Sequence, residues 1–553
     1  GPKEDAVRVA CIGNSITDGF GIGMAPVNGY PAVLQKKLGE GYLVKNFGVS
    51  ARTMMNKGDF PYMNELAWRD AQAFNPNIVV IKLGTNDSKT HNWVHGADEY
   101  RQSMQAMILR KEGSSFDLPL AIGLLGANNN IPEDHLKEYM MVGELSLDGT
   151  LQPIKGALPI AIRARAEHFK GLIVPEQNAR EAAVVNNLEV YGMKTLFEVI
   201  QFMSDRSNPS PTIVDTRKEF YENQTHCEYD YADVRGQENV KRALEVAAAG
   251  GHNLIMVGPP GSGKSMMAKR LPSILPPLTL SESLETTQIH SIAGKLGKNV
   301  SLISQRPFRS PHHTISQVAL VGGGTSPQPG EISLAHNGVL FCDELPEFNK
   351  TTLEVLRQPL EDRHINISRA KYSTDYPCSF MFVASMNPCP CGYYGDPTHR
   401  CVCTPGQIQR YMNKISGPLL DRIDIQCEIS PVPFQDISKA APGEPSAKIR
   451  ERVIKAREVQ AERFKDYKGI HCNAQMTERM IHQFAEPDEQ GIELLRMAME
   501  KLSLSARAYN RILKVARTIA DLAGSEQIKP DHIAEAVGYR TLDRGDWAER
   551  GHL

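Results

Sequence analysis

Short apolar runs that end in glycine and small polar residues recur along this chain, and stretches of helical period separate them. In the first 109 residues these runs are VRVACIG (Val7–Gly13), the segment 46–54 and NIVVIKLGTND (77–87). Later runs of the same kind are HNLIMVG (252–258), GVLFCDE (338–344) and FMFVASMNP (380–388). Strands that end in small polar loops are typical of parallel α/β sheets, whose ligands bind beyond the carboxyl ends of the strands. We therefore predict an α/β protein with ligand sites at these strand ends.

The length of the chain, 553 residues, allows about two to four domains with cores of their own. Its net charge is −2, so any contact with a polyanion would depend on local basic patches. No segment reaches the roughly 18 consecutive apolar residues of a membrane-spanning helix. We expect no membrane partner. The scattered cysteines in apolar runs predict a cytoplasmic, reducing environment for the larger, later part of the chain.

A glycine-rich loop joins the run 252–258 to a helical stretch. Such a loop turns successive backbone N–H groups toward one point, where they can hold phosphates. Lys264 can then reach the β- and γ-phosphates, and the Ser265 hydroxyl can hold Mg²⁺. The residues that we assign to nucleotide binding are Gly258, Pro259, Pro260, Gly261, Ser262, Gly263, Lys264 and Ser265.

The run 338–344 ends in two adjacent carboxylates, Asp343 and Glu344. We expect Asp343 to contact the metal and Glu344 to polarise the attacking water. A glycine-rich loop alone occurs by chance, but the two strands in this order are specific. The sequence therefore predicts that the chain binds ATP with Mg²⁺ and hydrolyses it.

Further segments resemble the AAA+ ATPases in the order that this superfamily requires. The segment 231–244, with a polar Gly-Gln before a helix, resembles the part that cups the adenine. Asn387 at the end of the run 380–388 matches sensor 1, which orients the lytic water. Arg422 matches the arginine that reaches the γ-phosphate of a neighbouring subunit. Arg507, on the helical stretch 504–518, matches sensor 2 of the lid.

Finer motifs narrow the resemblance to the magnesium-chelatase-like AAA+ group. These motifs are RPFRSPHHTIS (306–316), GEISLAHNGVLF, LRQPLEDR (356–363) and ASMNPCPCG. From residue 110 to the end, the chain is similar to the bacterial competence branch of this group. That resemblance implies a hexameric homo-oligomer that acts as an ATP-driven DNA helicase or branch-migration motor in natural transformation. An AAA+ remodelling or chelatase-type subunit that acts on a protein partner is the alternative.

Contacts to single-stranded or branched DNA would come from local cations. Arg306, Arg309, His312 and His313 lie in an insert that AAA+ helicases point toward the central pore, and Lys371 follows a strand of a second candidate hairpin. The stretch 448–468 is rich in lysine and arginine but also in glutamate, so we expect an exposed helix face with paired charges.

Four cysteines lie close together in CPCGYYGDPTHRCVC, namely Cys389, Cys391, Cys401 and Cys403. Two Cys-x-Cys pairs can place four thiolates around one tetrahedral Zn²⁺. We expect a structural zinc site, with reduced free thiols and a disulfide as the two alternatives. His399 is a substitute ligand, although four cysteines already complete the set.

Residues 110–205 resemble the domain shared by Lon proteases and the magnesium-chelatase-like ATPases, in the segments 110–127 and 142–182. Lon uses a serine–lysine dyad, in which the amine serves as base for the hydroxyl. The alignment places Leu120 at the serine position and Leu158 at the lysine position. We therefore expect no peptidase activity from this partial α+β domain.

The first 109 residues resemble the SGNH (GDSL-like) hydrolases, especially their carbohydrate esterases. GNSITDG would carry the nucleophile Ser15, and Gly48 and Asn86 would supply oxyanion-hole donors. The fold implied is the first half of a flavodoxin-like α/β domain. The Asp-x-x-His block that supplies the general base is absent from this part, and His91 and His95 fit exposed loop positions better. We expect a vestigial site without esterase activity.

Two partial domains thus meet near residues 108–110. We interpret the chain as an artificial or misassembled fusion, with a natural fusion as the alternative. The predicted parts are a partial SGNH-like domain (1–109), a partial Lon-like domain (110–205), a linker (206–228), an AAA+ core with the cysteine cluster (229–435) and a helical lid (436–553).

Overall fold

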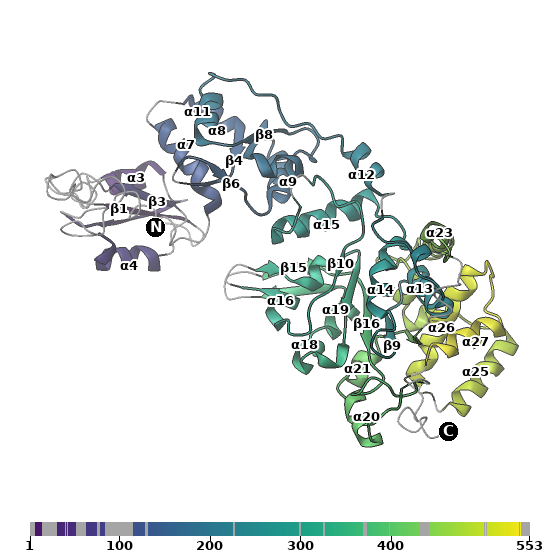
Figure 1. Cartoon of the computed structure of the whole chain (residues 1–553). Coiled ribbons are helices and arrows are strands. Elements are labelled where there is room, and N and C mark those ends of the chain that lie inside the picture. Colours follow the sequence, from purple (N-terminus) through teal and green to yellow (C-terminus); the bar gives the residue numbers. More distant parts are fainter. Residues whose placement is uncertain are drawn as a thin grey trace. The chain divides into compact units, whose positions relative to one another are not determined.

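The computed structural model divides the chain into two compact units, which are described separately (Figure 1). Unit 1 comprises residues 1–154, 172–176 and 191–210, and unit 2 comprises residues 155–171, 177–190 and 211–553. The structure describes residues 6–13, 30–38, 40, 42–50, 62–74, 78–82, 114–127, 131–146, 148–224, 227–297, 300–324, 327–368, 373–396, 399–431, 442–502, 504, 506–540 and 542.

Unit 1 contains a three-stranded parallel sheet near the start of the chain. Its order is β2 (Tyr42–Gly48), β1 (Val7–Gly13) and β3 (Ile78–Lys82), with Gly13 opposite both Gly48 and Lys82. The helices described beside these strands in the chain are α3 (Tyr30–Leu38) and α4 (Leu66–Ala73). The predicted parallel α/β arrangement is confirmed. Its described core is small, with Ile12, Tyr62, Trp68 and Ala71 buried.

A second set of elements in unit 1 has an aromatic core. The sheet has the order β4 (Tyr139–Met141), β7 (Gly171–Pro175) and β8 (Glu189–Met193), and β5 (Glu144–Leu145) pairs with β6 (Leu151–Gln152). The helices are α7 (Asp117–Ala127), α8 (Glu133–Glu138) and α11 (Leu196–Met203). The rings of Tyr139, Tyr191 and Phe202 pack together at centroid distances of 4.6–6.0 Å. Such pairs add to area burial because aromatic edges and faces attract.

The first helices of unit 2 pack on one another. They are α9 (Ala157–Ala166), α10 (Ala179–Ala182), α12 (Thr216–Gln224) and α15 (Leu280–Ala293), and α9 contacts both α10 and α15. Helix α12 lies within the segment 206–228 that we predicted as a linker. It is held by Glu219, which accepts hydrogen bonds from Arg180 (2.6 Å) and Ser301 (2.7 Å).

Unit 2 is built around a five-stranded parallel sheet. Its order is β10 (Phe308–Arg309), β13 (Val339–Cys342), β16 (Met381–Met386), β9 (Leu254–Val257) and β17 (Ile425–Glu428). Successive side chains alternate between two cores, as a strand of period two requires. Leu254, Met256 and Phe341 enter one core, and Ile255, Val257, Leu340 and Cys342 enter the other. Both faces are covered, which explains why these strands read as continuous apolar runs.

Two antiparallel hairpins interrupt the succession of sheet strands. One is β11 (Gly322–Gly323) with β12 (Gln328–Pro329), between β10 and β13, and the other is β14 (His364–Ser368) with β15 (Ser373–Pro377), between β13 and β16. Tyr376 donates a 3.1 Å hydrogen bond to Pro327 O and so joins the two hairpins. The neighbouring helices are α13 (Glu238–Gly250), α14 (Lys264–Arg270), α16 (Gln317–Val321), α17 (Glu331–Leu334), α18 (Lys350–Glu354), α19 (Arg357–Asp362), α20 (Pro405–Met412) and α21 (Gly417–Leu420).

The carboxyl-terminal part of unit 2 is a helical lid, as predicted. Its helices are α23 (Ser446–Arg463), α24 (Glu478–Phe484), α25 (Glu489–Lys501), α26 (Ala506–Leu522) and α27 (Pro530–Gly538). Several charges on α23 pair with other parts of unit 2, whereas Glu462 forms an exposed pair with Lys465. Arg452 donates to Glu245 of α13 at 2.6 Å, and Arg463 donates to Asp521 of α26 at 2.6 Å.

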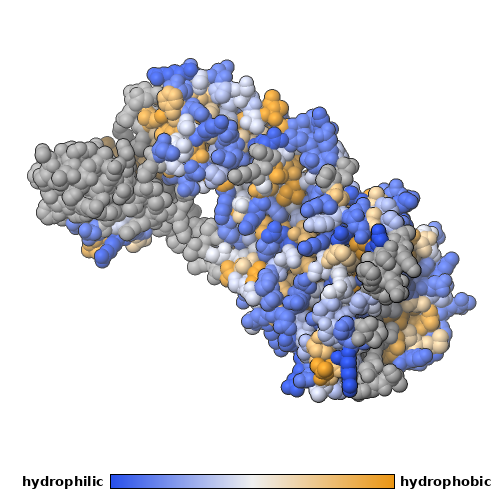
Figure 2. Space-filling model, in the orientation of Figure 1, coloured by the Kyte–Doolittle hydropathy of each residue, from blue (hydrophilic) through white to orange (hydrophobic). Residues whose placement is uncertain are grey.

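The described residues present a mainly hydrophilic surface on the face in Figure 2, with apolar spots over α20 and over α25–α27. Among the described helices, none combines the length and the apolar character that crossing a bilayer requires.

Candidate functional site

The glycine-rich loop connects the carboxyl end of β9 to α14. Gly263 has φ +90°, a left-handed conformation that glycine adopts without strain, and α14 begins at the next residue. Lys264 is buried, and its ammonium donates to the carbonyls of Gly258 (2.7 Å) and Pro259 (2.8 Å). Burial lowers the pKa of Lys264, and the charges of Asp343 and Glu344 oppose that shift. The loop is therefore closed around its own lysine, beside two carboxylates.

Ser265 and Asp343 meet across the two strand ends. The Ser265 hydroxyl donates a 2.6 Å hydrogen bond to Asp343 Oδ2. A hydroxyl and a carboxylate oxygen are the protein ligands that Mg²⁺ takes beside phosphates, so this pair fits the metal. The other carboxylate oxygen, Asp343 Oδ1, accepts from Ser385 of β16. Ser385 thus fixes the orientation of Asp343.

Glu344 follows Asp343 in a left-handed conformation, with φ 52° and ψ 52°. Its amide donates to Ser385 Oγ at 3.2 Å, and its half-exposed carboxylate points away from the strand. His313 Nδ1 lies 4.0 Å from Glu344 Oε2. A residue that we assigned to the DNA-contacting insert therefore lies beside the predicted base.

Asn387 and Gln237 complete the surroundings of the loop. Asn387 follows the last residue of β16, and its Oδ1 accepts from Lys264 at 3.3 Å. Gln237 donates from Nε2 to Ser262 O at 2.9 Å, so the predicted adenine-cupping segment touches the loop. The structure thus brings Lys264, Ser265, Asp343, Glu344 and Asn387 to one edge of the sheet.

The two predicted sensor and finger arginines lie outside this group of contacts. Arg422 follows α21 and donates to Glu361 Oε2 at 2.6 Å, with 28% of its side chain exposed. Arg507 lies in the first turn of α26, and its side chain is outside the part that the structure describes.

The insert arginines have partners within unit 2, and their assignment to DNA contact stays a prediction. Arg306 donates to the carbonyls of Pro276 (2.6 Å) and Asn337 (2.8 Å), and burial lowers its pKa. Arg309 forms a two-pronged ion pair with Glu331 at 2.6 and 2.7 Å. Both guanidinium groups donate to buried or half-buried acceptors. These hydrogen bonds hold the long insert against the rest of unit 2. Lys371 lies outside the described residues.

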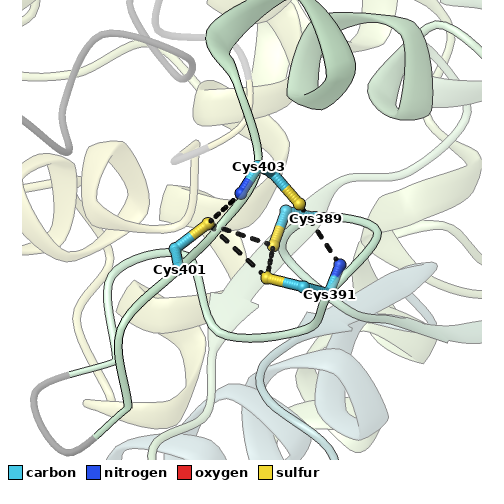
Figure 3. A group of neighbouring side chains, drawn as sticks. All are labelled: Cys389, Cys391, Cys401 and Cys403. Carbon is cyan, nitrogen blue, oxygen red and sulfur yellow. Dashed lines mark hydrogen bonds between the residues drawn. The ribbon is translucent and has the colours of Figure 1, made fainter.

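The four cysteines of the predicted zinc site lie together between β16 and α20 (Figure 3). Their sulfur atoms are all within 4.8 Å of one another. Three of the sulfur–sulfur distances are 3.3 Å (Cys389–Cys391), 3.7 Å (Cys389–Cys401) and 3.6 Å (Cys391–Cys401). A disulfide needs about 2.05 Å, whereas four sulfurs at about 2.3 Å from one zinc lie about 3.8 Å apart. All ten cysteines are free thiols.

Backbone amides donate hydrogen bonds to these sulfurs, as the groups around metal ligands do in metal sites. The amide of Cys391 donates to Cys403 Sγ, and that of Cys403 to Cys401 Sγ, both at 3.4 Å. The shifts within the cluster differ in direction. Burial opposes ionisation of Cys391, but amide and thiol hydrogen bonds outweigh it and lower its pKa to about 6, whereas burial raises the pKa of Cys401 to about 12 and also raises that of Cys403. The thiolate is the form that binds metal. His399 instead stacks on Tyr393 at 4.7 Å and lies 3.6 Å from Asp396.

The vestigial hydrolase residues are only partly described. Ser15 and Asn86 lie outside the described residues, as do His91 and His95. Gly48 is the last residue of β2, and its amide donates to Asn46 Oδ1 at 2.8 Å. At the Lon dyad positions, Leu120 is 46% exposed and Leu158 is buried. Neither leucine side chain can transfer a proton.

Sequence reasoning missed three residues of the nucleotide site. Ser385 is a polar residue inside an apolar strand, and that contrast is a usable signal. His313 lies 31 positions before Glu344, and nothing in the spacing joins them. Gly392, in the cysteine cluster, approaches Pro260 of the loop so closely that a Cβ would lie 2.7 Å from Pro260 Cδ.

Comparison with protein families finds the same two families as the motifs, and the two matches overlap between residues 103 and 136. Residues 230–437 match "Magnesium chelatase, subunit ChlI", residues 443–540 match its C-terminal part and residues 103–178 match "Subunit ChlI of Mg-chelatase". Residues 11–136 match the "GDSL-like Lipase/Acylhydrolase family". Both resemblances drawn from the motifs are confirmed.

Individual relatives agree with these families. "Competence protein ComM" of Haemophilus influenzae is 45% identical over 438 residues, which cover 79% of this chain and 84% of that protein. "Uncharacterized protein YifB" of Escherichia coli is 43% identical over 440 residues, with coverage of 79% and 84%. "Acetylxylan esterase" of Xylanibacter ruminicola is 73% identical over 107 residues, which are 19% of this chain and 22% of the esterase. The chain belongs to the magnesium chelatase (subunit ChlI) family of AAA+ ATPases, in the company of ComM and YifB, and it carries a segment similar to part of a GDSL-like acetylxylan esterase.

Proposed function

We propose that the chain is an ATP-hydrolysing motor that assembles into a hexameric ring and moves single-stranded or branched DNA. The role would be that of a helicase or branch-migration factor in natural transformation and recombination. The observation that carries the ATPase part is the 2.6 Å hydrogen bond between Ser265 and Asp343, which brings two Mg²⁺ ligands together beside the phosphate loop. The printed name of the Haemophilus relative, a competence protein, supports the DNA part.

The residues of the site divide the work of hydrolysis. The loop 258–265 binds the phosphates, with Lys264 released from the carbonyls of Gly258 and Pro259 to the β- and γ-phosphates. Ser265 and Asp343 would hold Mg²⁺, which neutralises charge on the phosphate oxygens. Glu344 orients and polarises the attacking water, and Asn387 helps to position it. Phosphoryl transfer depends mainly on such positioning and charge, so these few groups suffice.

A ring would complete each site with a residue from the next subunit. Arg422 is the candidate, because it is partly exposed and its side chain donates to the exposed Glu361. To act in trans it exchanges that surface ion pair for a phosphate, which costs little because exposed pairs are weak. Arg507 would act from the lid helix α26 of the subunit that binds the nucleotide.

The two hairpins are the candidate DNA-contacting elements. They interrupt the sheet between β10 and β13 and between β13 and β16, and Tyr376 joins them through Pro327. The sequence between β14 and β15 is Arg-Ala-Lys-Tyr (369–372), which includes Lys371. A few cations per subunit suffice for a phosphate backbone when a ring multiplies them. His313, in the same insert, lies 4.0 Å from Glu344 Oε2, so movement of the insert would change the surroundings of the carboxylate that polarises water.

We also assign a structural Zn²⁺ to Cys389, Cys391, Cys401 and Cys403. The sulfur separations of 3.3–3.7 Å and the amide donors to sulfur support this assignment over a disulfide.

The test is ATP turnover measured with and without single-stranded and four-way branched DNA, together with the mass of the assembly. We expect DNA to raise turnover and a hexamer to form with ATP. The Glu344→Gln variant serves as the control, since it retains ATP and assembles but releases no phosphate. ATP turnover that no DNA changes, in a protein that forms a hexamer, would favour the alternative of a remodelling or chelatase-type subunit with a protein partner. Turnover by a strict monomer would refute the ring.

A further inference from the structure

The cysteine cluster lies in direct contact with the phosphate-binding loop. Gly392 has φ +88°, and a Cβ built on it would lie 2.7 Å from Pro260 Cδ, 2.9 Å from Pro260 Cγ and 3.9 Å from Asn387 Cγ. Real Cβ atoms do not approach other atoms as closely as 2.7 Å, so only glycine fits here. The backbone at Gly392 therefore packs directly against Pro260 of the loop.

The same segment fixes the end of the sensor strand. Asn387 follows β16, and only Pro388 separates it from Cys389. Asn387 accepts a 3.3 Å hydrogen bond from Lys264, so the strand end also contacts the loop. Cys389 is fully buried in the core that also contains Met386, Ile408 and Tyr411. The phosphate loop thus contacts both Asn387 and Gly392, which lie at the two ends of the short segment that contains Cys389 and Cys391.

A metal ion would determine whether this support is rigid. The cysteines come in two pairs, one directly after Asn387 and one directly before Thr404, which caps α20. One ion bonded to all four sulfurs closes the chain between them into a fixed loop, which restricts the backbone conformations open to Gly392. In the free-thiol state, weak sulfur hydrogen bonds and packing remain.

We propose that the metal-loaded cysteine cluster is a positioning element of the ATP site, which holds Gly392 against Pro260 and Asn387 against Lys264. Loss of the metal then lowers nucleotide affinity and ATP turnover. This inference rests on the proposed ATPase function and on the assignment of Zn²⁺ to the cluster. The four cysteines act through Gly392 and Asn387 and do not themselves contact the reacting atoms.

The first test compares two variants that separate the metal from the contact. Cys401→Ser removes a ligand on the side away from Asn387, and Gly392→Ala introduces a methyl group against Pro260 while leaving all four sulfurs. We expect Cys401→Ser to lose zinc, and Gly392→Ala to keep about one zinc per chain. Both should hydrolyse ATP roughly tenfold more slowly or worse and bind a non-hydrolysable ATP analogue more weakly, since small displacements of positioning groups cost that much. Cys227→Ser, at an exposed thiol outside the cluster, should match the parent in zinc and in rate.

A reversible treatment guards against variants that do not fold. The parent protein is stripped with a zinc chelator, returned to excess Mg²⁺ and then given Zn²⁺ alone. Turnover and analogue affinity should fall on stripping and return with zinc, at unchanged circular dichroism.

Two results would overturn the proposal: parent-like affinity and turnover in zinc-free protein, or in Gly392→Ala. If the parent protein binds the ATP analogue but does not hydrolyse ATP, the proposed ATPase function is refuted instead. The dependence of analogue affinity on zinc then still tests whether the cysteine cluster positions the ATP site.

Discussion

His252 Nδ1 lies 2.9 Å from Asp424 Oδ2, and the His252 side chain is completely buried. Its other ring nitrogen lies 2.6 Å from Thr518 Oγ1 on the lid helix α26. His252 precedes β9 and Asp424 precedes β17, so this one imidazole joins two strands of the sheet to the lid helix. Because β9 leads into the phosphate loop and α26 carries Arg507, this contact couples the two parts of the candidate ATP site that have to remain in register.

Replacing His252 with alanine should destabilise unit 2 by about 3 kcal/mol or more, because it leaves a buried carboxylate without its partner. The measurement is the free energy of unfolding of the ATPase part in denaturant. His364→Ala is a matched control, since His364 lies 3.2 Å from Asp375 but both side chains are more than half exposed. That surface pair should contribute less than about 1 kcal/mol. Equal losses of unfolding free energy in the two variants would contradict a stabilising role for the buried contact of His252 with Asp424, which we call the His252 clamp.

The same clamp predicts a dependence on pH. Burial opposes ionisation of Asp424, but its hydrogen bond to His252 and the charges of His252, Lys514 and Arg511 lower its pKa below the usual value. The stabilisation is therefore fully present above the unfolded pKa of about 3.9 and is lost as the pH falls through the lower folded pKa. Accordingly, Asp424→Asn should be less stable than the parent at pH 7, and the difference should shrink below about pH 4. A constant difference across that range would count against the assignment.

Much of this architecture could be predicted because the strands of the ATPase sheet are buried on both faces. Continuous apolar runs such as LIMV and VLFC are strong signals, and the polar residues at their ends mark the site edge. The closeness of Ser265 to Asp343 follows from parallel topology, because both residues come just after the carboxyl ends of strands. The order of the strands in the sheet was not predicted. The presence of two families in one chain could be recognised because each family's motifs are short contiguous segments of the sequence.

The contacts that could not be predicted join residues far apart in the chain. No periodicity places His313 beside Glu344, or Gly392 against Pro260, since both depend on how long loops fold back. Charge was misleading for a physical reason: Arg306 and Arg452 look like surface cations in sequence, but each finds buried or half-buried acceptors within unit 2. A guanidinium group on a long stem serves either role, and composition does not distinguish them.

Replacing Lys264 with alanine should abolish ATP binding, whereas Glu344→Gln should preserve binding and lower turnover by about 100-fold or more. The reason is the division between phosphate cradle and water activation. Binding of a fluorescent ATP analogue and phosphate release measure the two steps. Glu347→Gln, at an exposed glutamate 3.3 Å from Lys414, is the matched control and should keep the parent rate within about twofold. A Glu344 variant that hydrolyses ATP as the parent does would overturn the catalytic assignment.

Arg422→Ala should leave ATP affinity unchanged and reduce turnover by about 10³-fold, because the finger stabilises charge in the transition state of the neighbouring site. Mixing this variant with parent subunits should lower the activity of the mixture more than dilution does. Arg496→Ala serves as control, since Arg496 is an exposed arginine with ion pairs to Glu493 and Glu500 on its own helix. A monomeric ATPase of unchanged rate would refute an action in trans.

Zinc should co-purify at about one ion per chain, because four sulfurs of one cluster complete a tetrahedral set. Removing it with a strong chelator should raise hydrogen exchange in the segment 386–404 and lower the thermal stability of unit 2, since the metal bonds are folding energy for that segment. Elemental analysis and exchange mass spectrometry provide the two measurements. Protein purified without chelator that contains no zinc would return the cluster to the free-thiol alternative.

The amino-terminal segment should show no esterase activity, although the family match names a hydrolase. A serine needs an imidazole within hydrogen-bond reach to become a nucleophile, and loss of one triad member lowers kcat about 10⁴-fold. The amide of Gly48, which the resemblance assigns to the oxyanion hole, donates to Asn46 Oδ1 in the structure. The chain also covers only 22% of the acetylxylan esterase that it resembles. Hydrolysis of nitrophenyl acetate by the parent and by Ser15→Ala should therefore be equal and close to the rate without protein. A burst or steady rate that disappears in Ser15→Ala would mean that a histidine such as His91 or His95 reaches Ser15, and that the site works.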